Sequence, residues 1–319
     1  MIKYIETNGD GDIFLLDANG LIKWKKSYLV HHTMKISHDG KRLFFFSMEK
    51  RDYRGVEAKF DKIIALDIAT GKEAGSWNVF DIKDQLEAEY GQALPLKKSS
   101  PSYNKENKKI GEIINEYTHF NSINLIPTNI DGFLNEEIIV NSGRGFVLFF
   151  NRDLKLSRKF WVDRIWNVNT HDAQITKDGN LLIYKNWDLN TRNSSLEVIS
   201  INTHELLWKY ELDPDGQSFK SSKFGSVQLF DDSSFLYSDM DKGGHFTVVD
   251  SDGKKLSSFY FPQLDPRDNL AQTFHTIRRV KFEDLSSEVQ GVLDKNLDRF
   301  LLKDFYKIFV TGGLITTIF

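Results

Sequence analysis

The stretch HDAQITKDGNLLIYKN (residues 171–186), followed by VISINTHELLW (198–208), decides the fold class of this chain. The first part predicts two strands joined at Asp178-Gly179, and the second predicts a further hairpin. Residues of these turns accept positive φ or hydrogen-bond their own backbone. The strands are too short, and too closely bounded by turn residues, to be helices. One unit of the chain therefore holds four short strands.

Both halves of this unit recur along the 319 residues. The hairpin motif, in which the second strand ends in an aromatic residue, occurs five times, as FLLDANGLIKW (14–24), IALDIATGKEAGSW (64–77), LFFNRDLKLSRKFW (148–161), VISINTHELLW (198–208) and VVDSDGKKLSSFY (248–260). From His119 onward the two halves alternate at roughly 50 residues per unit, the length of a four-stranded propeller blade. We therefore expect an all-β fold, a six-bladed β-propeller, with five blades as the alternative.

We expect the propeller to occupy residues 1–282, with an insertion at residues 81–117 on one rim. The insertion predicts a short helix around Asp81 to Tyr90. The run rich in Lys, Ser, Pro and Asn from Leu96 to Lys109 then predicts a mobile surface loop. This loop is either a lid over one channel mouth or a tolerated surface insertion.

Residues 283–319 form a C-terminal extension outside the blade pattern. Apolar residues at near-helical spacing predict a short amphipathic helix over 283–307, packed against the propeller. The stretch FVTGGLITTIF (309–319) predicts a strand that closes the ring by pairing with MIKYIET (1–7).

Composition excludes several classes of function. The net charge of -3 implies no general attraction to nucleic acid, so we expect no nucleic-acid partner. The absence of cysteine excludes disulfides, thiolate metal sites and cysteine catalysis. No signal peptide or membrane-spanning segment is evident. By sequence alone these features favour a cytoplasmic location, and they leave the compartment and the oligomeric state open.

A histidine opens three segments of similar shape, at His32, His119 and His171. His32 and His171 each stand eight residues before the glycine of an Asp-Gly turn. If the segments are equivalent repeats, the symmetry of a propeller gathers the three imidazoles at one point.

Taken in order, these segments resemble the arylsulfate sulfotransferase family of six-bladed propellers. The matching motifs are HHTMKISHDG (31–40), HFNSI (119–123), NSGR (141–144) and THDAQITKDGN (170–180), and the likeness runs from about Gly11 to Phe282. Members of that family move a sulfuryl group from an aryl sulfate ester to a phenolic acceptor. They use no nucleotide sulfate donor and no cofactor, and the reaction passes through a sulfated histidine.

By match of motif, the resemblance implies that His171 is the nucleophile. His119 and Arg144 would bind the sulfate oxygens and handle the phenolic proton. His32, with His31 as the alternative, would be a further channel histidine. It also implies an aryl sulfate donor and a phenolic acceptor as partners, and a periplasmic location as in exported relatives.

The residue types suit this chemistry. A neutral imidazole is a competent nucleophile, because its ordinary pKa is about 6.5. The sulfuryl group stays anionic throughout, and the planar guanidinium presents aligned donors to its oxygens. A second histidine acts as general acid and base.

The chain departs from the family in two places. Ser194 and Ser195 stand where many relatives carry a Ser-Arg pair, and Phe224-Gly225 replaces the histidine of the earlier repeats.

Two other functions compete with catalysis. Three imidazoles suit zinc or copper, although a nearby arginine opposes a cation and favours an anion. The rival from another class is a non-catalytic propeller that binds a ligand or protein at its channel mouth.

Overall fold

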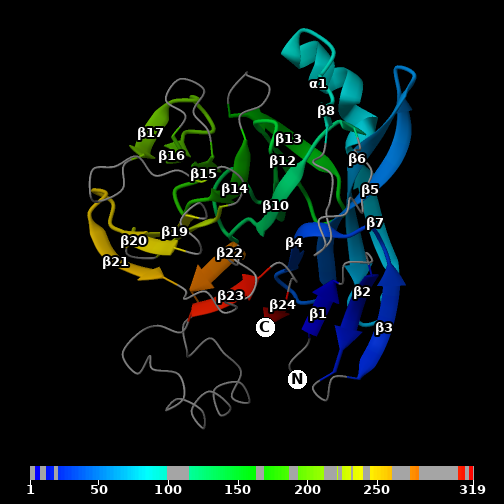
Figure 1. The fold of residues 1–319 in the computed structure, drawn as a ribbon, viewed down its shortest axis with the longest axis horizontal. Helices are drawn as coiled ribbons and strands as arrows, with labels where there is room; N and C mark the ends of the chain where they lie inside the picture. The colour runs from blue at the N-terminus through cyan, green and yellow to red at the C-terminus, as the bar shows by residue number, and fades with distance from the viewer. Residues whose placement is uncertain are drawn as a thin grey trace, which may run out of the picture.

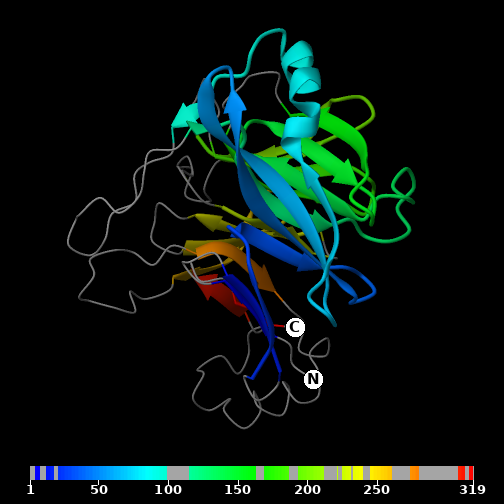
Figure 2. The same ribbon diagram turned by 90° about the vertical axis from the view of Figure 1, so that its right-hand side faces the viewer.

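In the part of the chain that the computed structural model describes, six β-sheets lie around a common centre (Figures 1 and 2). The structure describes residues 4–7, 12–17, 21–98, 115–162, 169–186, 193–211, 221, 225–230, 233–239, 245–260, 274–279, 308–312 and 316–318. The chain is a six-bladed β-propeller, as the repeats predict.

Three blades follow the simple order of four antiparallel strands. Their strands are β10 (Phe120–Leu125), β11 (Ile138–Ser142), β12 (Phe146–Phe150) and β13 (Leu156–Trp161); β14 (Thr170–Ile175), β15 (Leu181–Lys185), β16 (Ser195–Ile199) and β17 (Leu206–Tyr210); and β18 (Val227–Leu229), β19 (Phe235–Asp239), β20 (His245–Val249) and β21 (Lys255–Tyr260).

The chain ends close the ring. One blade has the order β24 (Thr316–Ile318), β1 (Tyr4–Thr7), β2 (Asp12–Leu16) and β3 (Ile22–Ser27). Tyr4 pairs with Ile318 in the antiparallel ladder of β1 and β24, which is the pairing that the sequence analysis expects. Beside this blade lies the sheet of β22 (Phe274–Arg279) and β23 (Ile308–Gly312). The helix expected over 283–307 lies outside the described residues.

The sixth blade is enlarged by the insertion. It contains β4 (His31–Ile36), β5 (Arg42–Tyr53), β6 (Val56–Asp67) and β7 (Glu73–Asn78), followed by the 3₁₀ helix η1 (Val79–Ile82), the helix α1 (Lys83–Tyr90), β8 (Lys97–Lys98) and β9 (Asn115–Glu116). The C-terminal half of the long β6 pairs with β7, while Ala58 and Lys59 in its N-terminal half pair in parallel with β9.

The predicted helix of the insertion is confirmed, because η1 and α1 together span Val79 to Tyr90. The predicted loop is wrong at its start, where Lys97 and Lys98 form β8 by pairing with β9. The rest of that predicted loop, residues 99–109, lies outside the described residues. No helix in the described ranges is long and apolar enough to cross a membrane.

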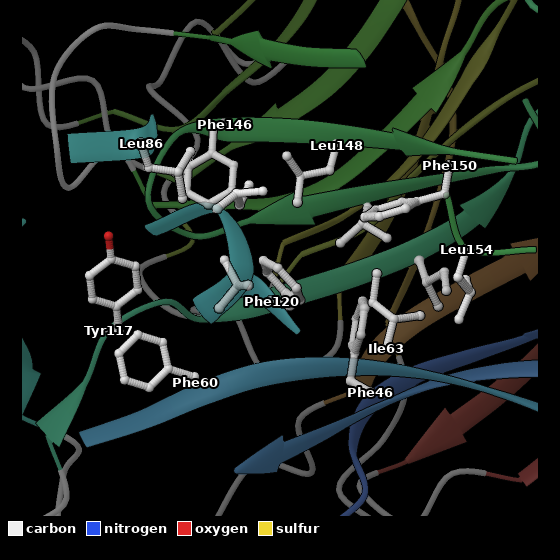
Figure 3. Close-up of a cluster of buried hydrophobic side chains, with 14 of the residues drawn as sticks. Phe46, Phe60, Ile63, Leu86, Tyr117, Phe120, Phe146, Leu148, Phe150 and Leu154 are labelled. Carbon is white, nitrogen blue, oxygen red and sulfur yellow. The ribbon is translucent and has the colours of Figure 1, made fainter. Parts of the chain in front are cut away.

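The largest apolar cluster fills the space between the β4–β7 and β10–β13 blades (Figure 3). Phe46, Phe60 and Ile63 meet Phe120 and residues of β12 there, and Leu86 joins the cluster from α1. The Phe60 and Tyr117 rings stack with centroids 4.7 Å apart. Burial of so much aromatic surface fixes these two blades against each other.

Hydrogen bonds from side chains to backbone also join the inner strands of neighbouring blades. Each of three successive strands uses a side-chain oxygen to accept a backbone N–H from the next blade. These bonds are Ile123 N to Thr33 Oγ1 (2.9 Å), Ala173 N to Ser122 Oγ (3.3 Å) and Val227 N to Asp172 Oδ2 (3.1 Å). We call this set the inner belt. The inner belt provides side-chain acceptors for backbone N–H groups that have no hydrogen-bond partner within their own sheet.

Amide side chains add a second bond at two of these junctions. Asn124 donates to Asp172 Oδ1 at 2.7 Å and to Ala173 O at 2.9 Å, and Gln174 donates to Val227 O. The carboxylate of Asp172 therefore links three blades.

Replacing Asp172 with alanine should destabilise the propeller. The change removes a buried acceptor of bonds from two neighbouring blades, so we expect the free energy of unfolding to fall by about 2 to 4 kcal/mol. Denaturant unfolding measures this change. Asp178→Ala, in an exposed turn of the same blade, is the matched control and should change the free energy of unfolding by less than about 0.5 kcal/mol. Equal effects of the two substitutions would contradict the role of the inner belt.

Candidate functional site

The four predicted site residues come from three neighbouring blades. His32 lies on β4, His171 on β14, His119 directly precedes β10, and Arg144 lies in the turn between β11 and β12. β10 packs between β4 and β14, so the residues approach one another at the inner strands.

The inner belt places His32 and His171 at equivalent positions, directly before Thr33 and Asp172. Each lies in a β-bulge of its strand. The corresponding residue of β10 is Asn121, not His119. The expectation of three equivalent histidines is therefore wrong for His119, because alignment on the histidine letter is two residues out of step with the strand register.

Backbone hydrogen bonds identify the residue of the next blade that is structurally equivalent to His119. Its carbonyl accepts the N–H of Gly143 at 2.7 Å, and the carbonyl of Asn169 accepts the N–H of Asn186 at 2.7 Å. His119 is thus the counterpart of Asn169. In β22 the bulge falls at His275, a position that the sequence analysis did not assign to the site.

Three histidine rings meet at the junction of β4 and β10. Nδ1 of His31 lies 2.7 Å from Nδ1 of His32. The ring of His32 packs edge-on against that of His119, with centroids 4.8 Å apart. Adjacent residues of a regular strand point to opposite faces, but the bulge and the φ of 58° at His32 break this alternation. Strained backbone of this kind costs about 1 to 3 kcal/mol and occurs often at functional sites.

The buried carboxylate of Asp61, on β6, lies behind this cluster. Its Oδ1 lies 3.1 Å from His31 Nε2, and its Oδ2 accepts bonds from Thr118 Oγ1 at 2.6 Å and from Phe120 N at 3.1 Å. Desolvation alone would raise the pKa of Asp61, but His31 and Thr118 oppose it, and the pKa lies below its ordinary value. Asp61 is therefore ionised at neutral pH.

Glu116 on β9 joins His119 to Arg144. Its Oε2 lies 3.1 Å from His119 Nδ1, and its carbonyl accepts a bond from Arg144 Nη2 at 2.9 Å. Arg144 is only 2% exposed. Burial lowers its pKa to about 10, opposed by the charges of Glu116 and Asp61, so the guanidinium stays cationic at neutral pH.

His171 has a different partner, within its own blade. Its Nδ1 lies 2.5 Å from Asn186 Oδ1, and Asn186 Nδ2 donates to Ser221 O at 2.7 Å. The second bond sets the orientation of the amide, so Oδ1 faces the imidazole. Nδ1 therefore donates, and in the neutral ring the lone pair is on Nε2.

The structure thus brings His32, His119 and Arg144 together through Glu116 and one ring contact, and places His171 on the adjacent strand β14. Sequence reasoning missed Asp61, Glu116 and Asn186. An available signal was Asp61 itself, an aspartate beside an apolar run in FDKIIALD (60–67).

Two lysines add positive charge nearby. Burial lowers the pKa of Lys59 and of Lys97, and Glu116 opposes both shifts. Across the described ranges, no group of three or more histidine, aspartate or glutamate side chains is placed to hold a metal ion.

No protein-family model matches the sequence, and no curated protein matches it significantly. Solved structures are similar at low identity. The Dos1 propeller is 12% identical, with a TM-score of 0.47, over 83% of this chain and 57% of that one. BamB from Moraxella catarrhalis is 13% identical, with a TM-score of 0.38, over 80% and 75% of the two chains. TolB from Acinetobacter baumannii is 13% identical, with a TM-score of 0.42, over 79% and 49%.

The ionised Asp61 predicts a pH dependence of stability. Its pKa in the folded protein lies below the unfolded value of about 3.9. Its stabilising contribution is therefore complete above that pH and is lost as the pH falls through the folded-state pKa. At pH 7 we expect the wild-type protein to have a higher melting temperature than Asp61→Asn, and we expect this difference in melting temperature to shrink below about pH 4. A difference that stays constant from pH 7 to pH 3 would contradict the assignment.

Proposed function

We propose that this protein is a sulfotransferase that moves a sulfuryl group from an aryl sulfate ester to a phenolic acceptor through a sulfated His171. The observation that supports this most is the bond from His171 Nδ1 to Asn186 Oδ1, at 2.5 Å. It favours the tautomer whose nucleophilic lone pair is on Nε2. The ordered motifs that resemble arylsulfate sulfotransferases supply the reaction class.

In the first half-reaction, the lone pair on His171 Nε2 forms a bond to sulfur as the bond from sulfur to the phenolic oxygen breaks. The leaving phenolate takes a proton from His119. In the second half-reaction, an acceptor phenol returns a proton to His119 and attacks sulfur, and the nitrogen–sulfur bond breaks. The donor and acceptor visit one site in turn, which gives ping-pong kinetics.

The surroundings of His119 and Arg144 fit these roles. Glu116 accepts from His119 Nδ1, so Nε2 of the ring is left to exchange the proton. Arg144 keeps its charge in a buried setting, where an interaction with sulfuryl oxygens is stronger than in water.

Turnover of 4-nitrophenyl sulfate tests the proposal. With an acceptor phenol present we expect continuous release of nitrophenol, and without one at most a single equivalent per site. No release with any of a panel of phenols would contradict catalysis. Binding of the same ester without turnover would support the rival, a non-catalytic propeller.

His171→Ala should abolish turnover and leave the melting temperature nearly unchanged, because the ring is proposed to react and not to support the fold. His204→Asn is the matched control. His204 is exposed, stacks on Phe160 and has a φ of 61° that asparagine tolerates, so both turnover and stability should be retained. Turnover in His171→Ala would exclude this residue as the nucleophile.

Arg144→Lys should lower kcat/KM roughly 10-fold or more, because an ammonium does not reproduce the planar pair of donors. The comparison is valid if circular dichroism and the melting temperature match wild type. Unchanged kcat/KM in a folded variant would show that Arg144 supports the fold only.

A further inference from the structure

We propose that Asp61, His31 and His32 form a proton relay, in which Asp61 and His31 are positioning residues and His32 exchanges a proton beside His119. The use of this relay in catalysis rests on the proposed function. The existence of the relay does not, because it follows from the contacts of the described residues.

The first step is the protonation of His31. Two oxygens lie near its Nε2, Asp61 Oδ1 at 3.1 Å and Ser47 O at 3.3 Å. Asp61 is ionised and Ser47 offers a carbonyl, so both are acceptors. Nε2 of His31 therefore carries a proton, and the only ring nitrogen left to face His32 is Nδ1.

The second step is the contact between the two rings. A separation of 2.7 Å between two Nδ1 atoms is that of a hydrogen bond, which requires one proton between them. Either His32 donates to a neutral His31, or an imidazolium at His31 donates to His32. In the first state both rings are neutral, and in the second the pair holds one more proton, on His32 Nε2, and one positive charge.

This arrangement moves a proton without exposing Asp61. When Nε2 of His32 takes up a proton, the shared proton passes to His31 Nδ1, and His31 becomes an imidazolium held by the Asp61 carboxylate. Release from His32 Nε2 reverses the movement. One proton enters or leaves, and the positive charge is neutralised by a buried partner.

The location suits a role in the proposed reaction. The His32 ring contacts that of His119, and the leaving phenolate removes a proton that the acceptor phenol later returns. The charged groups that act on Asp61 are His119 and Arg144 from other elements and Lys59 from β6 itself. Glu116 contacts His119, and Lys97 lies near Glu116 and Arg144. The backbone of His32 is held in the left-handed region, at φ 58°, the conformation that brings two successive rings into contact.

Nitrogen-15 NMR of histidine side chains tests the relay without any substrate. At neutral pH we expect His31 protonated at Nε2 and one shared proton between the two Nδ1 atoms. On acidification both rings should change over the same pH range. Asp61→Asn should change the tautomer of His31, because Phe120 N and Thr118 Oγ1 hold the amide oxygen and turn its NH₂ group towards His31. Independent titration of the two rings, or an unaltered tautomer in Asp61→Asn, would overturn the relay.

Kinetics test its use in catalysis. His31→Gln keeps a donor for Asp61 but removes the nitrogen that faces His32, so the folding contacts of Asp61 survive. We expect kcat for 4-nitrophenyl sulfate to fall about 10- to 100-fold with little change in KM. Asp67→Asn, farther along β6 in a turn with Thr70, is the control and should keep wild-type kcat. If NMR confirms the relay but His31→Gln keeps the wild-type kcat, the relay exists and has no role in catalysis. If the wild-type protein shows no turnover, the proposed function is wrong, and the NMR evidence for the relay is unaffected.

Discussion

The inner belt of hydrogen bonds is the constraint on which the rest of this structure depends. In a propeller each blade completes its own sheet, so backbone groups at the blade junctions need partners from elsewhere. Here Thr33, Ser122 and Asp172 supply them in turn to the next blade. Because these side chains are equivalent, the residues beside them are equivalent as well. The belt therefore sets which side chain lies in the bulge of β4, β10 and β14.

The candidate site follows from this constraint. His32 and His171 lie at the bulge positions, and Asn121 occupies that position on the strand between them. His119 reaches the cluster from two residues farther back, where Glu116 orients it. His32 is linked to Asp61 through His31, His119 contacts Glu116, and His171 contacts Asn186. Similar segments in three blades produce three different chemical environments.

The sequence predicts the blades but not the register of the site. Hairpin motifs and turn residues predict the strands, and the apolar stretches at the two ends of the chain predict the ring closure, since each of these features is local in the sequence. A bulge adds one residue to a strand and leaves no distinct mark in the pattern, yet it moves the following side chains to the other face. The bulge of β10 falls at Asn121, so His119, which aligned by letter with His171, is instead the structural counterpart of Asn169. The partners come from nearby chain: Glu116 lies three residues before His119, and Asp61 and Asn186 belong to the same blades as His31 and His171. The sequence motifs do not show these contacts, because they depend on which face of each strand or turn carries the side chain.

The most direct measurement of the central claim is the site of covalent modification. The protein is mixed with 4-nitrophenyl sulfate in the absence of acceptor, quenched at alkaline pH, where the nitrogen–sulfur bond of a sulfated histidine survives, and digested for peptide mass spectrometry. The account predicts a sulfuryl group on the peptide that contains His171, and its loss when an acceptor phenol is added before the quench. A sulfuryl group on another residue, or an unmodified His171 peptide while nitrophenol is released, would contradict it.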